Sequence, residues 1–285
     1  MSTLSLALVA AIPLVLSPAT YSRLRVSITY AWRHHRLPHI ARPVRFTEWV
    51  QWRKLFDRDL SLALLTDKLG AKDVARACIG DEHVIPTLWS GTELPSLPPW
   101  LLPFIVKANH GCGQFVVVRN YTDWGRAQRE APKWLASPYG IWLDEWHYGR
   151  ARRVLMVEPF VGPSQGLPVD YKIYVFDGVA RYIQVHLDRA SDHRWMQYDR
   201  DWRPLSVRND DDVRRPATLD TMLRAAEAIS MRRDFLRVDF YEVDGRMLFG
   251  ETCLFPGSGL DPFQPDKLDH VLGGYWSDAR AFRKS

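Results

Sequence analysis

Two Asp-Gly pairs, each between β-rich apolar runs, constrain this fold more than any other feature of the sequence. They are Asp177-Gly178, between runs at 170–176 and 180–186, and Asp244-Gly245, between runs at 235–243 and 246–253. Asp-Gly favours the tight two-residue turn of a β-hairpin, because both residues accept a positive φ. We therefore predict two antiparallel hairpins in the C-terminal half of the chain.

Helices are indicated where apolar residues recur at helical spacing. We expect them from 47, from about 67, from 122 to about 135 and from 218 to about 230, with a buried strand at 154–161. The connector at 79–103 is expected to carry one short strand at Val84-Ile85. The polar residues 191–216 are predicted to be a loop.

A third strand–loop–strand unit, at 104–118, holds Gly111 and Gly113 in its loop. Glycines there allow backbone N–H groups to turn inward and cradle an anion, and Lys107 ends the first strand, where an ammonium can lie over phosphates. An ordinary hairpin with an edge-strand lysine explains the same residues. The segment is not a Walker loop, and no Gly-x-Gly-x-x-Gly opens a helix, so two commoner nucleotide folds are excluded.

Two acids, Asp239 and Glu251, lie on opposite strands of the last hairpin, and the loop length decides whether they share a face. A two-residue turn pairs 239 with 250, whereas a three-residue loop with a bulge pairs 239 with 251. If both acids share a buried face, we expect their repulsion to burden the metal-free protein until Mg²⁺, which prefers oxygen ligands, relieves it. The alternative is one buried and one exposed acid.

Composition indicates a globular cytoplasmic protein. The 285 residues are 46% hydrophobic and 25% charged, enough for one large core or two lobes. The net charge of +5 permits an anionic ligand, but scattered Lys and Arg do not indicate nucleic acid. Three cysteines are too few for a disulfide framework or a zinc site, which favours a reducing compartment.

The first 21 residues carry no charge, and residues 4–16 are almost wholly apolar. The segment is borderline for a bilayer span of roughly 20 residues, and it lacks the basic start of a secretory signal. Two interpretations stay open: membrane association through residues 3–18, and a buried or docking helix. The arginines that follow would keep the body at the inner face of the membrane.

In this order the motifs resemble the TupA-like branch of the ATP-grasp superfamily, named for a teichuronopeptide biosynthesis protein. The resemblance covers roughly residues 43–274. It rests on Asp67-Lys68-Leu69, the segment 106–113, Glu158-Pro159-Phe160, Asp170-Tyr171-Lys172, Asp188-Arg189, Arg237-Val238-Asp239 and Phe249-Gly250-Glu251. It implies an α+β ATP-grasp fold, in which two α+β lobes grip a nucleotide between antiparallel sheets.

The resemblance also implies four ranges along the chain. They are an N-terminal apolar segment and basic linker at 1–42, a helical region at 43–103, a small ATP-binding lobe at 104–161 and a metal- and phosphate-binding lobe at 162–285.

The same resemblance implies ATP and Mg²⁺ as cofactors and a set of site residues. Lys68, Lys107 and Lys172 would contact phosphates, residues 158–161 would form the hinge that holds adenine, and Arg189 would meet the γ-phosphate. Asp239 and Glu251 would bind Mg²⁺. The implied cofactor-binding set is Lys68, Lys107, His110, Gly111, Gly113, Glu158, Pro159, Phe160, Val161, Asp170 and Lys172, and the implied catalytic residues are Arg189 and Lys172.

The implied activity is an ATP-dependent carboxylate–amine ligase that works through an acyl phosphate. Its partners would be a carboxylate and an amine, with amino acids and polysaccharide as candidates, in cell-surface polysaccharide or teichuronopeptide biosynthesis. One departure is Cys253, where many ATP-grasp enzymes carry Asn, because a neutral thiol is a poor magnesium ligand. An alternative is therefore a catalytically weak or inactive nucleotide- or carbohydrate-binding component. A glycosyltransferase using Asp210 and Asp212 is a third hypothesis, which the order of strands does not favour.

Overall fold

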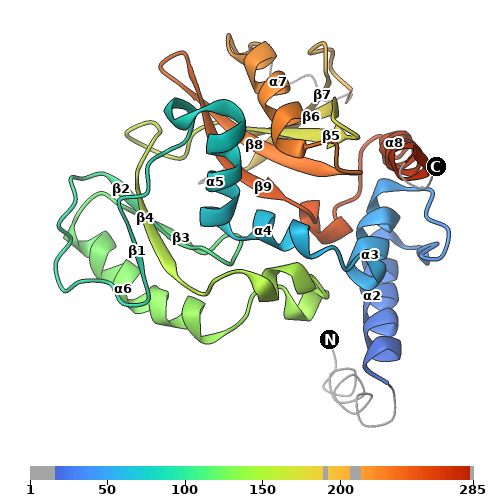
Figure 1. The fold of residues 1–285 in the computed structure, drawn as a ribbon, viewed down its shortest axis with the longest axis horizontal. Coiled ribbons are helices and arrows are strands. Elements are labelled where there is room, and N and C mark those ends of the chain that lie inside the picture. Colours follow the sequence, from blue (N-terminus) through green and yellow to red (C-terminus); the bar gives the residue numbers. More distant parts are fainter. Residues whose placement is uncertain (1–16, 189–191, 206–212, 283–285) are drawn as a thin grey trace. The chain divides into compact units, whose positions relative to one another are not determined.

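The chain divides into two compact units in the computed structural model, which describes residues 17–188, 192–205 and 213–282 (Figure 1). Within these, the first unit comprises 17–58, 142–145 and 255–277, and the second comprises 59–141, 146–254 and 278–282. Each unit is a group of residues that pack mainly with one another. The four ranges implied by the resemblance divide the chain by function, and they stay a prediction.

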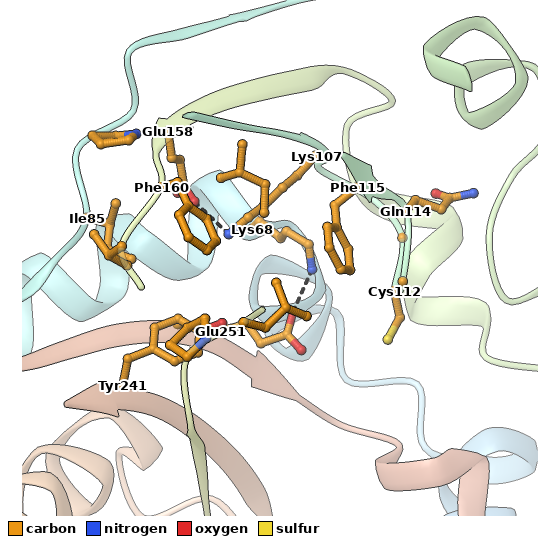
Figure 2. A pocket seen from close by; sticks show the side chains of 18 residues that line it. Lys68, Ile85, Lys107, Cys112, Gln114, Phe115, Glu158, Phe160, Tyr241 and Glu251 are labelled. Atoms are coloured by element: carbon orange, nitrogen blue, oxygen red, sulfur yellow. Dashed lines mark hydrogen bonds and ion pairs between the residues drawn. The ribbon is translucent and has the colours of Figure 1, made fainter. Parts of the chain in front are cut away.

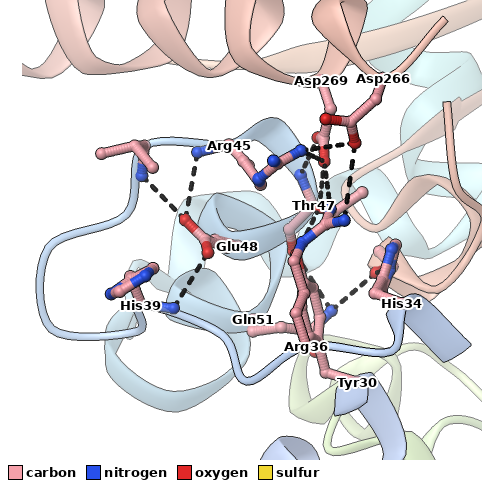
Figure 3. A network of polar contacts seen from close by, with 12 residues as sticks. Tyr30, His34, Arg36, His39, Arg45, Thr47, Glu48, Gln51, Asp266 and Asp269 are labelled. Atoms are coloured by element: carbon pink, nitrogen blue, oxygen red, sulfur yellow. Dashed lines mark hydrogen bonds and ion pairs between the residues drawn. The ribbon is translucent and has the colours of Figure 1, made fainter. Parts of the chain in front are cut away.

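The first unit is built from helices: α2 (Pro18–His34), α3 (Phe46–Phe56), the 3₁₀ turn η6 (Pro256–Gly259) and most of α8 (Lys267–Phe282). Trp276 of α8 is fully buried between Phe46 and Trp49 of α3, with ring centroids 5.4 and 6.0 Å away. The backbone N–H and hydroxyl of Thr47 donate to Asp269 at 2.9 and 2.8 Å (Figure 3). The helix predicted from 47 is thus confirmed, and it begins at Phe46.

Helix α2 begins directly after Ser17, whose side chain accepts a hydrogen bond from the N–H of Thr20 at 3.3 Å. Most of the predicted membrane segment, residues 3–16, lies outside the described residues. Across 17–188, 192–205 and 213–282, no helix has both the length and the apolarity that crossing a bilayer demands.

The second unit holds two antiparallel sheets. Helix α6 (Tyr121–Ala136) covers the four-stranded sheet, and their shared core includes Phe104, Trp124 and Leu155. Helices α5 (Lys68–Ile79) and α7 (Leu219–Ser230) pack with the five-stranded sheet. The first sheet has the order β1-β4-β2-β3, with β1 (Trp89–Gly91), β2 (Phe104–Ala108), β3 (Phe115–Val118) and β4 (Leu155–Pro159). The second has the order β7-β6-β5-β8-β9, with β5 (Asp170–Phe176), β6 (Val179–Leu187), β7 (Arg194–Asp199), β8 (Leu236–Val243) and β9 (Arg246–Cys253).

The remaining elements of this unit are helical. They are the 3₁₀ turns η2 (Leu60–Leu62), η3 (Asp81–His83), η4 (Ile141–Leu143) and η5 (Trp146–Arg150), and the helices α4 (Ala63–Thr66), α5 (Lys68–Ile79), α6 (Tyr121–Ala136) and α7 (Leu219–Ser230). The helices predicted from about 67, from 122 and from 218 are confirmed as α5, α6 and α7.

Both predicted Asp-Gly turns are confirmed. Asp177 and Gly178 have φ of 46° and 79°, and Asp244 and Gly245 have φ of 50° and 69°. Positive φ at both central residues is the geometry of a tight hairpin turn, which explains why this residue pair occurs twice.

Two expectations about strands are wrong. The predicted loop at 191–216 contains β7, because the consecutive residues Met196, Gln197 and Tyr198 are buried and pair with β6. The short strand of the connector is β1 at 89–91, whereas Val84 makes only a single bridge to Phe249. Asp210 and Asp212, the acids of the glycosyltransferase hypothesis, lie outside the described residues.

Candidate functional site

A cleft in the second unit is lined by residues from α5, both sheets and the glycine-rich loop (Figure 2). Part of its wall is apolar and part is charged. The apolar side chains are Ile85, Ile105, Phe115, Pro159, Phe160, Val161, Leu167 and Pro168, and the charged ones are Lys68, Lys107, Glu158 and Glu251. Such a cleft suits a ligand with one flat apolar end and one anionic end.

The glycine-rich loop reaches the cleft through its backbone. Gly113 has a φ of +70°, which a side chain would strain, and a Cβ at Gly111 would lie 2.0 Å from Oε1 of Gln114. Both glycines line the cleft. The loop therefore brings main-chain atoms to the cleft, and the positive φ of Gly113 is a backbone conformation that favours glycine.

Glu158 of β4 is buried, and two lysines neutralise it. Its Oε2 accepts from Nζ of Lys107 at 2.7 Å, and its Oε1 accepts from Nζ of Lys72. Burial acts to raise the pKa of Glu158, but Lys107 and Lys72 outweigh it and hold that pKa below its usual value. Lys107 lines the cleft, so a bound phosphate would compete with Glu158 for its ammonium.

Lys68 stands in the first turn of α5 and points at Glu251 of β9. The helix begins there because the Asp67 side chain caps it, accepting from the N–H of Gly70 at 2.9 Å. Nζ of Lys68 lies 2.7 Å from Oε2 of Glu251. Burial acts to raise the pKa of Glu251, but Lys68, followed by Lys172 and Arg237, brings it well below the usual value.

Asp239 lies opposite Glu251 in register, as one of the two predicted alternatives requires. The turn nevertheless has two residues, and the bulge comes at Gly250, between the pairs Asp239–Glu251 and Phe240–Phe249. A Cβ on Gly250 would lie 3.1 Å from the carbonyl oxygen of Asp239, so the bulge favours glycine.

The expected repulsion between the two acids stays a prediction, and the structure favours the opposite effect, because three cations of the protein, Lys68, Lys172 and Arg237, pair with them. Asp239 is 1% exposed; Arg237 donates to both of its oxygens at 2.7 Å, and Lys172 donates to Oδ2 at 2.6 Å. Lys172 also donates to Asp170 at 2.5 Å. Burial acts to lower the pKa of Lys172, but Asp170 and Asp239 outweigh it and raise that pKa. Glu251 is held by Lys68.

Glu251 should stabilise the protein in a pH-dependent way. A carboxyl whose pKa falls on folding contributes stability above its unfolded pKa, near 4.5, and loses it as the pH falls toward the folded value. We expect Glu251→Gln to lower the free energy of unfolding by about 1.5 kcal/mol at neutral pH and by less at pH 3. Urea unfolding at the two pH values tests this, with the exposed pair member Glu130→Gln as control. An equal loss at both pH values would refute the ionic role.

The cleft brings together nine of the implied site residues but not all of them. They are Lys68, Lys107, Gly111, Gly113, Glu158, Pro159, Phe160, Val161 and Glu251. Asp170, Lys172 and Asp239 are buried in the five-stranded sheet and do not line it. His110 does not line it either: its ring is fully buried, with Nε2 3.0 Å from the carbonyl oxygen of Trp134. Arg189 lies outside the described residues.

Two functional candidates were missed by the sequence analysis, Lys72 and Arg237. Lys72 follows Lys68 by four residues, which puts both on one face of α5. Arg237 precedes Asp239 by two residues, which puts both on one face of β8. In both cases the distance along the sequence from a predicted site residue could have indicated the second residue.

The donor atoms suit a hard divalent cation in part. No group of three or more His, Cys, Asp and Glu that could hold a metal occurs among the residues described. Asp239 and Glu251 offer carboxylate oxygens, and Glu251 lines the cleft, so phosphate and water would have to complete a magnesium shell. Burial raises the pKa of Cys253 to about 12, which keeps the thiol neutral and makes it a poor ligand.

Two antiparallel sheets that both contribute to a lysine-lined cleft are the arrangement expected of an ATP-grasp protein. The chain belongs to the TupA-like ATP-grasp family: the family model described as TupA-like ATPgrasp matches residues 48–277. No curated protein sequence matches this chain.

Solved structures of ligases are similar to this chain. D-alanine–D-alanine ligase from Bacillus anthracis is similar with a TM-score of 0.51 at 16% identity, over 79% of this chain and 70% of that one. The same ligase complexed with ATP gives 0.45 at 15%, over 78% and 68%. VanG D-Ala:D-Ser ligase from Enterococcus faecalis gives 0.48 at 13%, over 78% and 62%. At 16% identity the likeness to the first of these structures shows the fold alone.

Proposed function

We propose that this chain is an ATP-dependent carboxylate–amine ligase that uses Mg²⁺. The observation that carries the proposal is the cleft, in which Lys68 and Lys107 and the glycines Gly111 and Gly113 line the same space as apolar side chains. The ligase name of the similar structure from Bacillus anthracis supports it. In this proposal residues 158–161 hold adenine and the lysines meet the phosphates.

The charge balance of the cleft and the adjoining sheet supports an anionic ligand. Five cations stand against four carboxylates, so the cluster has a net charge of +1 before any ligand binds. The cations are Lys68, Lys72, Lys107, Lys172 and Arg237, and the acids are Glu158, Asp170, Asp239 and Glu251. Phosphates would replace Glu158 and Glu251 as partners of Lys107 and Lys68, which frees Glu251 for Mg²⁺.

The proposed reaction has two transfers. A carboxylate oxygen of the substrate bonds to the γ-phosphorus while the bond to the β–γ bridging oxygen breaks, giving an acyl phosphate and ADP. An amine nitrogen then bonds to the acyl carbon, phosphate leaves with the carboxylate oxygen, and the amine loses a proton. Magnesium would supply charge neutralisation for the transferring phosphoryl group.

In this proposal the chain's own residues position the nucleotide and neutralise the charge of its phosphates. Lys68 and Lys107 bind phosphate, and the glycine loop admits it without side chains. Lys172 keeps Asp170 and Asp239 in place, so its proposed catalytic part is exerted through the ordering of Asp239. A γ-phosphate contact by Arg189 belongs to the same proposal.

The substrates are proposed by class. The carboxylate and the amine are sought among amino acids and polysaccharide fragments, in keeping with a role in cell-surface polysaccharide or teichuronopeptide biosynthesis at the cytoplasmic side. Cys253 favours a second candidate, a nucleotide-binding component without turnover, since its neutral thiol leaves the metal position one ligand short.

Replacing Lys107 should weaken nucleotide binding without unfolding the protein. Lys107→Ala removes one charge-assisted contact, which is worth about 1.5 to 3 kcal/mol, and leaves Lys72 to hold Glu158. We therefore expect an ATP dissociation constant about 10- to 150-fold higher by calorimetry. Lys133→Ala, an exposed lysine paired with Glu130, is the matched control. Unchanged affinity in folded Lys107→Ala would remove this lysine from the phosphate site.

ADP release tests the ligase proposal. The parent is incubated with Mg-ATP and a panel of amino acids and uronic-acid-containing oligosaccharides, alone and in pairs. We expect ADP release that depends on one carboxylate and rises with one amine, and that is lost in Glu251→Gln. Tight Mg-ATP binding without carboxylate-dependent release across the panel would favour the component without turnover.

A further inference from the structure

Helix α2 carries two apolar stripes on opposite sides. Val26, Tyr30 and His34 recur every four residues and are buried in the first unit. Leu24, Ile28 and Trp32 recur with the same spacing, offset by two residues, and are 37%, 51% and 70% exposed. Two residues turn a helix by about 200°, so the second stripe faces away from the first. Three aligned apolar side chains form a continuous surface, unlike the single exposed residues that are common on proteins.

The buried residues Val26, Tyr30 and His34, here called the inward stripe, fix the rotation of the helix about its axis. The exposed residues Leu24, Ile28 and Trp32 are called the outward stripe. The hydroxyl of Tyr30 lies 2.9 Å from Oγ1 of Thr47, and Nε2 of His34 lies 3.0 Å from the carbonyl oxygen of Gly259 (Figure 3). Tyr30 is completely buried. The exposure of the outward stripe therefore follows from the packing of the first unit.

The surroundings of the outward stripe are cationic. Helix α2 contains Arg23, Arg25 and Arg33 and no acidic residue. Arg23 and Arg33 are exposed and adjoin the two ends of the stripe, and the guanidinium of Arg33 lies 5.6 Å from the ring of Trp32. Arg25 pairs with Asp144, and Arg33 lies 3.8 Å from Asp261.

The sequence around α2 also carries an excess of positive charge. Residues 17–58 hold nine Lys and Arg against two acids, a net charge of +7, whereas the whole chain carries +5. Acids of 142–145 and 255–277 reduce the charge of the first unit to +3 over its described residues. The part of the unit that contains the stripe therefore stays positive.

We propose that α2 docks this protein on the surface of an anionic phospholipid bilayer. Leu24, Ile28 and Trp32 enter the boundary between headgroups and acyl chains, and Arg23 and Arg33 meet lipid phosphates. Leucine, isoleucine and tryptophan beside arginine are the composition of helices that lie in the membrane interface. The inference is independent of the proposed ligase activity.

Charge complementarity selects this partner over two other occupants. A second copy of the chain would bring two cationic surfaces together, which repel. The uncharged residues 1–16 would cover the apolar stripe but offer no counterion to Arg23 and Arg33. An anionic bilayer satisfies both the stripe and the arginines.

Vesicle sedimentation of the full chain tests the proposal. The vesicles are phosphatidylcholine alone or phosphatidylcholine mixed with phosphatidylglycerol. We expect binding to the mixed vesicles, a loss of at least about tenfold in partitioning for Ile28→Gln/Trp32→Gln, and weakening by added salt. Glutamine keeps helix propensity high. The matched control is Leu97→Gln/Leu101→Gln, which changes two leucines of the second unit that are 69% and 93% exposed.

Three outcomes would overturn the proposal. The first is an absence of binding by the parent, and the second is equal binding by the stripe variant and the parent. The third is a change in oligomeric state of the stripe variant by light scattering, which would assign the stripe to a second copy. Deleting residues 1–16 completes the test: loss of binding on deletion, with the stripe variant unaffected, would place the contact in those residues.

Discussion

Lys172→Met is expected to lower the free energy of unfolding by about 3 to 5 kcal/mol, because it leaves two carboxylates buried without their shared cation. Lys172 is 4% exposed, and its Nζ lies 2.5 Å from Oδ2 of Asp170 and 2.6 Å from Oδ2 of Asp239. Methionine retains an unbranched apolar stem, so the charge is the main loss. Urea unfolding followed by circular dichroism measures the change. Lys133→Met, at a lysine whose side chain is 66% exposed, should change it by less than about 0.5 kcal/mol.

A second substitution separates charge from packing. In the double variant Lys172→Met/Asp170→Asn one of the stranded carboxylates becomes neutral, so the double variant should be more stable than Lys172→Met alone. A cost of under about 1 kcal/mol for Lys172→Met, or no recovery in the double variant, would show that the buried charges do not depend on this lysine.

Asp239→Asn is expected to have a destabilising effect of the same size, about 3 to 5 kcal/mol in the absence of nucleotide. The substitution leaves Arg237 without the carboxylate that accepts two of its hydrogen bonds, and it removes one of the two acids that hold Lys172. The exposed acid Asp201, also in the second unit, gives the control Asp201→Asn. Thermal and urea unfolding of the apo proteins measure the difference.

The sign of this effect decides between two accounts of the acids. Repulsion between Asp239 and Glu251 would make apo Asp239→Asn at least as stable as the parent, whereas compensation by Arg237 and Lys172 makes it less stable. Adding Mg-ATP then tests the metal role. If Asp239→Asn gains as much stability from Mg-ATP as the parent, Asp239 is not a magnesium ligand in the bound state.

The hairpins were predictable because their turns depend on local chemistry. Asp177-Gly178 and Asp244-Gly245 need positive φ at both positions, and few residue pairs other than Asn-Gly and Asp-Gly provide it. Helices α5 (Lys68–Ile79) and α7 (Leu219–Ser230) were predictable because their apolar spacing is regular and Asp67 caps the first of them.

Features that depend on distant contacts were not predictable. The bulge at Gly250 is set by the approach of β8, and it determines the face of Glu251 without any change in the turn. Strand β7 lies within a mostly polar stretch of sequence and is ordered by pairing with β6. Helix α8 was missed, although its packing of Trp276 on Phe46 and Trp49 builds the core of the first unit.

In the candidate site, too, some residues could be predicted from the sequence, whereas contacts between distant residues could not. The sequence order indicated Lys68, Lys107 and Glu251, which do line the cleft. It did not indicate that Glu158 is held by Lys72, because that contact joins α5 to β4 across 86 residues. It also placed His110 with the ligand contacts, whereas burial against Trp134 removes the ring from the cleft.

Calorimetric titration of the folded parent with Mg-ATP tests the central claim, that this cleft is a nucleotide site. The account predicts saturable binding with one nucleotide per chain, abolished or reduced by several hundredfold in Lys68→Met/Lys107→Met and unchanged in Lys133→Met. Circular dichroism establishes that each variant is folded. An absence of Mg-ATP binding by the folded parent, or equal affinity in the parent and the double variant, would contradict the account.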